Sequence, residues 1–435
     1  MTTLFKDVLI LDGEREKAER GHILVSKGRI QSLMSLSTTP PSADRVVEGY
    51  GKTAVLPGFV NAHTHAAMTL LRGLGEEVPL MEWLQKKIWP VEEKMTAEHI
   101  RRGTQLAILE MVSMGTTCFA DMYFEMDEVA QAALEAGMRC ALCRGITDGP
   151  AGADGERKID KSVRDGLRLF ETWHGREGLL TVQLGPHALY TVPLKDMKTI
   201  VAQAKERGIG IHHHFLEIKW ELEYLRNELK LTPEDYLRET GLLDTVGTVL
   251  AHGVWMDPAW AEALDLSKIT IVHNPNSNMK LASGVMPLER WLDKNVGLAL
   301  GTDGASSNNR LDMWDEMRNA VLLHRGVTRD PVSVLARDVL RMATFEGARA
   351  FGFVNTGLIR EGWTADLVMV DLDRPHYVGV NEENLGAFVV YAGTSADVRG
   401  TMINGKWAFL DGAWLTLDRD EIVAKAREAR EEITK

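Results

Sequence analysis

The sequence predicts an α/β protein, a (β/α)8 barrel joined to a small β-sandwich domain formed from both chain termini. Eight short apolar runs alternate with amphipathic stretches along the middle of the 435-residue chain. That alternation is typical of parallel strands separated by helices. Both ends of the chain are instead rich in strand-forming residues and Gly turns. Hydrophobic residues make up 45% and charged residues 26%, which are values of a folded globular protein.

The barrel is expected to span residues 57–357. A helical pattern over 97–114 ends at Gly115, as helix C-termini often do. Other predicted helices cover 194–207, 286–295 and 332–342. The eight predicted strands are 54–65, 116–122, 139–146, 180–186, 209–214, 245–252, 269–274 and 296–303.

The flanking segments, 1–56 and 358–435, are expected to pair into the small β domain. Residues 3–11 and 22–34 have the composition of short strands with turn residues between them. The charged tail, 420–435, is predicted to form a surface helix.

Charge and composition exclude several classes of protein. The chain has 50 basic and 62 acidic residues, a net charge of −12, whereas proteins that follow a nucleic-acid backbone usually show the opposite balance. No apolar run approaches the roughly 18 residues that a membrane helix needs. We therefore expect a cytoplasmic protein that binds neither nucleic acid nor membrane. Cys140 and Cys143 have redox or zinc spacing but lie in an apolar run, which favours buried thiols.

Four predicted strands end in side chains that bind metals. The first ends in His63-x-His65, and residues two apart on a strand point to the same side. The fifth ends in His214, the sixth in His252 and the eighth in Asp303. Catalytic residues of such barrels lie at the C-terminal ends of the strands, so these side chains are expected to converge. Imidazole and carboxylate suit zinc or iron, with a position left open for water.

Each of these residues also has an ordinary structural explanation. A His at a strand end, such as His252, is often a core residue, and Asp303 could be a helix N-cap. The run His212-His213-His214 leaves the identity of the ligand open. Their joint occurrence at the same end of different strands favours the metal site.

The motifs resemble those of the amidohydrolase superfamily, whose barrels are of the TIM type, over nearly the whole chain. More narrowly, the chain is similar to the 5′-methylthioadenosine/S-adenosylhomocysteine deaminase branch, although triazine hydrolases and other purine-type deaminases share part of that pattern. The segments that carry the superfamily resemblance are 57–65, 251–252, 301–304 and 361–368, and those that carry the branch resemblance are 68–73, 185–188, 273–280 and 301–309.

The resemblance implies one divalent metal ion per chain, zinc being expected. Binuclear relatives carry a lysine at the end of strand four, where this chain has Gly185-Pro186-His187. The branch places a Glu three residues after the metal-binding His of strand five, and only His214, followed by Glu217, fits that spacing. The implied ligands are His63, His65, His214 and Asp303.

The resemblance also implies a reaction, the hydrolytic removal of the 6-amino group of an adenosine-type nucleoside. S-adenosylhomocysteine, 5′-methylthioadenosine, 5′-deoxyadenosine and adenosine are the expected substrates. Glu217 would protonate ring N1, His252 would contact the attacking oxygen, and Asp303 would carry a proton from water to the departing amine. Alternatives on the same scaffold are a triazine-type chlorohydrolase or aminohydrolase and a guanine or cytosine deaminase. A binding protein without activity is the third possibility.

Further substrate contacts follow from the same resemblance. Glu92 is expected to hold ribose hydroxyls and His187 to contact the nucleoside. Arg144, and less clearly Arg157 in the Gly-rich loop, would meet the carboxylate of S-adenosylhomocysteine, because a guanidinium binds carboxylate through two hydrogen bonds. Trp83 could line the pocket or belong to the core. A solvated charge for Glu92 and a surface ion pair for Arg144 remain the alternatives. The resemblance further implies a homo-oligomer.

Overall fold

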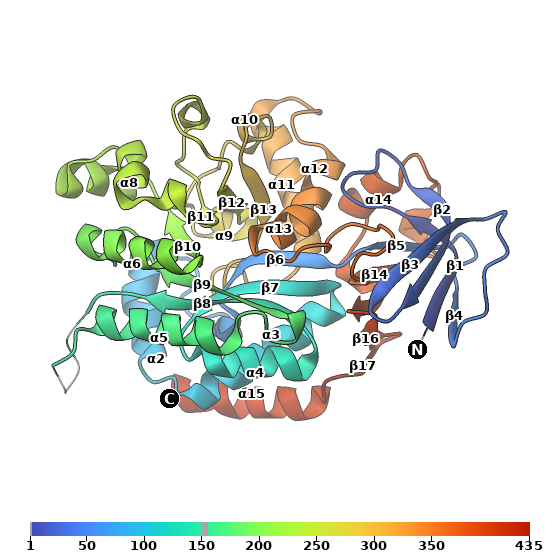
Figure 1. Cartoon of the computed structure of the whole chain (residues 1–435), viewed down its shortest axis with the longest axis horizontal. Coiled ribbons are helices and arrows are strands. Elements are labelled where there is room, and N and C mark those ends of the chain that lie inside the picture. The colour runs from blue at the N-terminus through green and yellow to red at the C-terminus, as the bar shows by residue number, and fades with distance from the viewer. Residues whose placement is uncertain (1, 150, 152–154) are drawn as a thin grey trace.

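The barrel is an eight-stranded parallel sheet in a computed structural model that describes residues 2–149, 151 and 155–435 (Figure 1). The strands follow one another in chain order around the sheet. Each lies within three residues of its predicted ends, except the first, whose apolar run is split at Gly58. The strands are β6 (Phe59–Thr64), β7 (Thr116–Tyr123), β8 (Arg139–Ile146), β9 (Leu180–Pro186), β10 (Gly210–Phe215), β11 (Thr248–His252), β12 (Ile269–His273) and β13 (Gly297–Leu300).

The first and last strands of the barrel meet at a seam that lies at the predicted metal site. The backbone N–H of Asp303 donates to the carbonyl oxygen of His63 at 2.9 Å. Beside it, the side chain of Asn61 accepts from Thr302 N at 2.9 Å and donates to Thr302 Oγ1 at 2.7 Å. The same hydrogen bonds therefore close the barrel and fix two predicted ligands, His63 on the first strand and Asp303 just after the last.

Helices cover the outside of the barrel (Figure 1). The helix α6 has the predicted ends, because Gly208 at φ 67° terminates it in the left-handed conformation. The predicted helix 286–295 is shorter than expected, since Pro287 precedes it and the chain turns after Trp291 to enter β13. The α-helices are α1 (Leu80–Trp83), α2 (Trp89–Glu92), α3 (Ala97–Ser113), α4 (Met126–Ala136), α5 (Lys158–Trp173), α6 (Leu194–Arg207), α7 (Trp220–Tyr224), α8 (Pro233–Thr240), α9 (Pro275–Lys280), α10 (Leu288–Trp291), α11 (Met313–Thr328), α12 (Ala336–Arg341), α13 (Gly347–Ala350), α14 (Leu385–Tyr391) and α15 (Arg419–Thr434).

Strands from both termini form one continuous mixed sheet of nine strands beside the barrel (Figure 1). Its centre is the antiparallel pair β5 and β14, which joins the two ends of the chain. The fold class predicted from the sequence is confirmed. The strands are β1 (Thr2–Ile10), β2 (Glu19–Ser26), β3 (Arg29–Ser35), β4 (Arg45–Glu48), β5 (Thr53–Pro57), β14 (Leu367–Asp371), β15 (Val398–Ile403), β16 (Lys406–Leu410) and β17 (Ala413–Trp414).

Two contacts attach the terminal segments to the barrel. Arg139 at the start of β8 forms a buried ion pair with Asp366, which precedes β14; the two side chains are only 6% and 1% exposed. The tail helix α15 lies along α3, where His99 Nε2 and Glu432 Oε2 are 3.0 Å apart and Arg430 donates to the carbonyl of Leu70 at 2.7 Å (Figure 1). The C-terminal helix thus packs on the barrel.

The interior of the barrel is filled by small and branched side chains such as Val60, Ala120 and Val272. Cys118, Cys140 and Cys143 are free and buried, as expected, and burial raises the pKa of the Cys118 thiol. In the described part of the chain, every helix is too short or too polar to cross a bilayer.

Candidate active site and metal centre

A cavity of about 740 Å3 opens at the C-terminal ends of the barrel strands. It is where the strand-end rule places catalytic groups. His63 lies beneath its floor and is fully buried. The predicted site residues that line the cavity are His65, Trp83, Glu92, Arg144, His187, His214, Glu217, His252 and Asp303.

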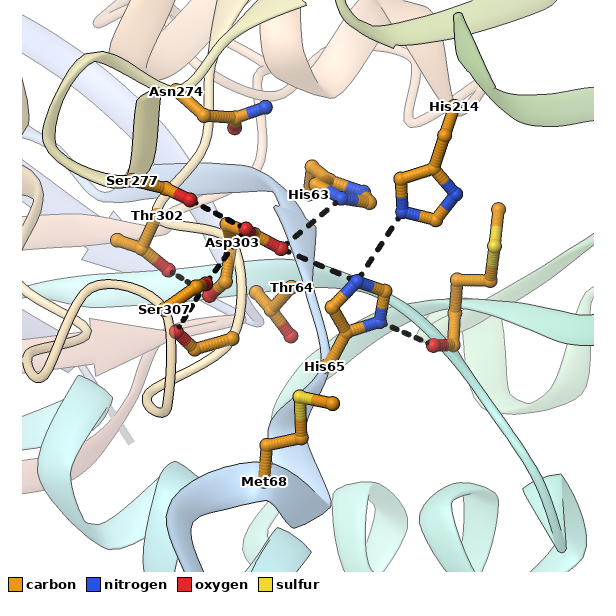
Figure 2. Close-up of polar contacts among 12 residues, drawn as sticks. His63, Thr64, His65, Met68, His214, Asn274, Ser277, Thr302, Asp303 and Ser307 are labelled. Carbon is orange, nitrogen blue, oxygen red and sulfur yellow. Dashed lines mark hydrogen bonds and ion pairs between the residues drawn. The ribbon is translucent and has the colours of Figure 1, made fainter. Parts of the chain in front are cut away.

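Two imidazoles present their Nε2 atoms to each other at the centre of the site. Nδ1 of His65 lies 2.6 Å from the carbonyl oxygen of Met122, and Nδ1 of His214 lies 2.8 Å from that of His187. A carbonyl only accepts, so both Nδ1 atoms carry the proton, and a neutral ring then has a lone pair on Nε2. The two Nε2 atoms are 3.3 Å apart (Figure 2).

The carboxylate of Asp303 adds a third acceptor beside the Nε2 atoms of His65 and His214. Its Oδ1 lies 3.2 Å from His65 Nε2 and 3.5 Å from His63 Nε2. Its Oδ2 accepts the hydroxyls of Ser277 and Ser307 at 2.6 and 2.7 Å, which fixes the carboxylate and leaves Oδ1 to face the imidazoles (Figure 2). Burial opposes ionisation of Asp303, but the neighbouring imidazoles of His63 and His65 hold its pKa well below the usual range.

The nitrogen and oxygen atoms that converge here fit the coordination of a divalent metal ion. The ligand atoms of His63, His65 and Asp303 lie within 4.8 Å of one another, as do those of His63, His214 and His252. His63 Nε2 is buried without a hydrogen-bond partner among the described residues. Converging acceptors repel unless a cation lies between them. A proton can partly fill that role: burial lowers the pKa of His65, but Asp303 outweighs burial and raises it to about 9.

His252 differs chemically from these imidazoles. Its Nδ1 accepts from the side-chain amides of Asn278 at 3.0 Å and Asn274 at 3.3 Å. The amide nitrogen of Asn274 also donates to the carbonyl of Val272, which fixes its orientation. The ring proton of His252 is therefore on Nε2, and burial lowers the pKa of the ring to about 4. His252 is a neutral hydrogen-bond donor pointing into the site.

Glu217 lies on the turn that follows β10. Its Oε2 is 3.7 Å from His252 Nε2, and its Oε1 accepts the hydroxyl of Ser283 at 3.2 Å. Burial, reinforced by the charge of Asp303, raises the pKa of Glu217 to about 8. At neutral pH this carboxyl is mostly protonated, and it can donate a proton to a group in the cavity.

Three strands end at or just before a residue with a positive φ, which turns the chain sharply and orients the site residues. Leu216 after β10, His252 at the end of β11 and Asp303 after β13 have φ values of 51°, 73° and 60°. This left-handed region is uncommon for residues other than Gly and costs on the order of 1–3 kcal/mol when the residue is strained. The surrounding hydrogen bonds hold each sharp turn at the mouth of the barrel.

The sequence profile of amidohydrolases matches residues 54–408. The chain belongs to the amidohydrolase family. A 5-methylthioadenosine/S-adenosylhomocysteine deaminase of Dictyoglomus thermophilum is 42% identical over 393 residues, 90% of each chain. A 5′-deoxyadenosine deaminase of Methanosarcina mazei is 38% identical, with 98% of this chain and 96% of that one covered. An adenosine deaminase from Xanthomonas campestris with bound zinc superposes with a TM-score of 0.91 at 32% identity, covering 99% of this chain and 98% of the other.

The amidohydrolase site also carries polar groups away from the metal centre. Tyr123 donates its hydroxyl to Glu92 Oε1 at 2.5 Å, and burial raises the pKa of Glu92. Arg144 donates to the carbonyl of Gly145 at 2.7 Å and lies 5.4 Å from the ring centre of Phe124. Within the described chain it has no carboxylate partner. The Arg144 guanidinium is therefore available to an anion in the cavity.

Arg157 lies outside the cavity lining. Its guanidinium forms two hydrogen bonds with Asp196, at 3.1 and 2.8 Å, and its side chain is 49% exposed. The neighbouring Lys158 lines the cavity instead. Part of the Gly-rich loop before Arg157, residues 150 and 152–154, falls outside the described residues.

Sequence reasoning missed Tyr123, Lys158 and Ser283. Tyr123 is the last residue of β7, one position past the predicted end of that strand, so the strand-end rule could have found it. Ser283 lies on a loop 66 residues after its partner Glu217, and no local pattern marks it.

Proposed function

We propose that this amidohydrolase is a hydrolytic deaminase that replaces the 6-amino group of an adenosine-type nucleoside by oxygen and releases ammonia. One arrangement carries the proposal: the protonated carboxyl of Glu217 and the Nε2–H of His252 face the converging acceptors of His65, His214 and Asp303 across one cavity. Relatives named as deaminases of 5-methylthioadenosine, S-adenosylhomocysteine, 5′-deoxyadenosine and adenosine support it.

A single zinc ion per chain is part of this proposal, with His63, His65, His214 and Asp303 as its ligands. Bound there, the ion would lower the pKa of water toward about 7 and so supply a nucleophile at neutral pH. His252 is left out of the ligand set because its Nε2 carries a proton. Zinc bound to the Xanthomonas relative supports the choice of metal.

The chain's own residues provide the proton transfers. Glu217 Oε2 holds a proton and donates it to ring N1, so that negative charge does not accumulate on the ring as water adds to C6. Asp303 Oδ1, which faces the imidazoles, takes one proton from the attacking water and delivers it to the departing amine. The second proton of the water leaves the C6 hydroxyl as the C6–N bond breaks and C6=O forms, and it replaces the proton that Glu217 gave to N1. His252 Nε2 donates a hydrogen bond to the attacking oxygen. Each general acid–base step contributes about 10²–10⁴-fold to rate.

The rest of the cavity is proposed to bind the nucleoside. Glu92, oriented by Tyr123, would accept hydrogen bonds from both ribose hydroxyls. His187 lines the wall beside the purine, with its Nδ1 held 3.0 Å from Thr191 Oγ1. Arg144 would pair with the carboxylate of an amino-acid tail at the 5′ position. A cytoplasmic location and assembly into homo-oligomers, inferred from the sequence, belong to the same proposal.

The test is a deamination screen with purified, metal-assayed protein. S-adenosylhomocysteine, 5′-methylthioadenosine, 5′-deoxyadenosine and adenosine are compared by kcat/KM with guanine, cytosine and a chlorotriazine, from ammonia release and the ultraviolet change of the ring. Turnover of the nucleosides, lowered about 10²–10⁴-fold in the Glu217→Gln variant, is expected. Activity on a free base or the triazine but not on the nucleosides would overturn the proposal.

A further inference from the structure

The turn that carries Glu217 is held by a second buried carboxylate. Glu221, on α7, accepts three consecutive backbone N–H groups: Leu216 N at 3.0 Å on Oε2, and Glu217 N at 2.7 Å and Ile218 N at 3.1 Å on Oε1. Its side chain is only 2% exposed. Every carboxylate oxygen of Glu221 is thus engaged with the backbone of this turn.

The turn needs such a support. Leu216 has a φ of 51°, in the left-handed region that a leucine rarely adopts. It is fully buried, so the N–H groups beside it cannot turn to solvent, and an unpaired buried N–H costs about 1–3 kcal/mol. A buried carboxylate that accepts several N–H bonds forms strong, charge-assisted contacts. Glu221 therefore determines the direction in which the chain leaves β10.

We propose that Glu221 is a positioning residue, which fixes the backbone of residues 216–218 so that the carboxyl of Glu217 reaches the ring nitrogen of the substrate. The inference rests on the acid role proposed for Glu217. Glu221 itself touches neither substrate nor metal ligand; it acts through the 2.7 Å bond to the main chain of Glu217.

The side-chain contacts of Glu217 agree with this assignment. Ser283 donates to Oε1, and the other oxygen, Oε2, faces His252 and the cavity. Burial raises the pKa of both Glu217 and Glu221 to about 8, and two nearby buried carboxyls resist ionising together. Both oxygens of Glu221 accept backbone N–H groups, whereas Oε2 of Glu217 faces His252 and the cavity, so Glu217 is the carboxyl placed to donate a proton in the proposed reaction.

A double-mutant cycle tests the proposal. Glu221→Gln keeps the shape of the side chain but presents an amide NH2 to N–H donors, so the turn must shift. We expect kcat for 5′-methylthioadenosine to fall about 10–100-fold, with KM within about threefold of the parent and metal content unchanged. In a Glu217→Gln background, Glu221→Gln should cause no further loss, because it acts only through Glu217.

The matched control is Glu223→Gln, the same chemical change at an exposed position of α7, which should leave kcat unchanged. If Glu221→Gln does not fold, Glu221→Asp replaces it in the cycle, since it keeps the charge and withdraws it by one methylene. The proposal is overturned by a parent-like kcat in the Glu221 variant, or by an equal loss in both backgrounds. Full activity of Glu217→Gln alone would instead overturn the acid role itself.

Discussion

Replacing Glu217 by Gln should greatly lower turnover and make the protein progressively more stable, relative to the parent, as the pH rises from 5 to 8. The side chain is 9% exposed, and its pKa is raised from an ordinary 4.5 to about 8 by burial and then by the charge of Asp303. A carboxyl with a raised pKa binds its proton more tightly in the folded state than in the unfolded state. Between pH 4.5 and about 8 the parent protein therefore loses stability as pH rises, whereas a glutamine at this position does not titrate.

The magnitude follows from this interval. Each pH unit between the unfolded and the folded pKa changes the free energy of unfolding by about 1.4 kcal/mol. The raised pKa of Glu217 therefore lowers the free energy of unfolding at pH 7 by about 3 kcal/mol relative to that below pH 4. The glutamine amide can lose contacts of its own, but that loss is the same at every pH. The quantity that tests the prediction is thus the pH dependence of the stability difference between variant and parent, and not the size of that difference at one pH.

The assay is thermal unfolding of parent and variant from pH 4 to pH 8, on metal-free protein, so that no metal ion lowers the pKa of Glu217. The Tm of Glu217→Gln minus that of the parent should rise steadily with pH, while the same difference for the exposed Glu223→Gln control stays flat. Turnover of the metal-loaded variant should fall about 10²–10⁴-fold. A Tm difference that stays constant or falls with pH would refute the reasoning about burial of Glu217.

Four further outcomes are expected. Arg144→Met should lower kcat/KM for S-adenosylhomocysteine about 10–100-fold, while that for 5′-methylthioadenosine, which lacks a carboxylate, changes by less than about threefold; equal losses for both would remove Arg144 from the tail site. Glu92→Gln should raise KM for the nucleosides about tenfold without changing metal content, as measured by steady-state kinetics and metal analysis, because an amide accepts fewer hydrogen bonds from a diol. Zinc added to chelator-treated protein should raise Tm more at pH 8 than at pH 6, because the metal must displace the proton that Asp303 keeps on His65, whose pKa is about 9; the opposite order would contradict the assigned ligands. Arg139→Met should destabilise the protein by about 3–5 kcal/mol in urea unfolding, since it leaves the charge of Asp366 buried and unpaired, and adding Asp366→Asn should recover part of that loss.

The barrel strands were predictable because each is a short apolar run ended by polar residues. The run 180–186 coincides with β9, and 194–207 coincides with α6, where Gly208 marks the end. The predicted helix 286–295 was too long, because Pro287 and the turn into β13 decide its length and not the apolar spacing. Local chemistry therefore fixes elements that have clear terminators.

The site was predictable to the extent that it follows the strand-end rule. His65 and Asp303, 238 positions apart in the sequence, lie 3.2 Å apart because each stands at the mouth of its strand. Arg157 lies on a loop, and its position depends on its ion pair with Asp196 at the start of α6. No sequence spacing predicts that contact. Ser283 reaches Glu217 through another loop. Residues on loops are placed by tertiary contacts, and local sequence patterns do not predict those contacts.

The different roles proposed for the histidines show why tertiary structure is needed to assign them. His65, His214 and His252 have the same side chain and lie at the same mouth of the barrel. A main-chain carbonyl on Nδ1 of His65 and of His214 makes Nε2 the atom with a lone pair when the ring is neutral, whereas amide donors on Nδ1 of His252 leave an Nε2 that carries a proton. A metal ligand requires the first state and a hydrogen-bond donor to the attacking oxygen requires the second. The partners behind the rings therefore decide which imidazoles bind the ion and which one assists the reaction.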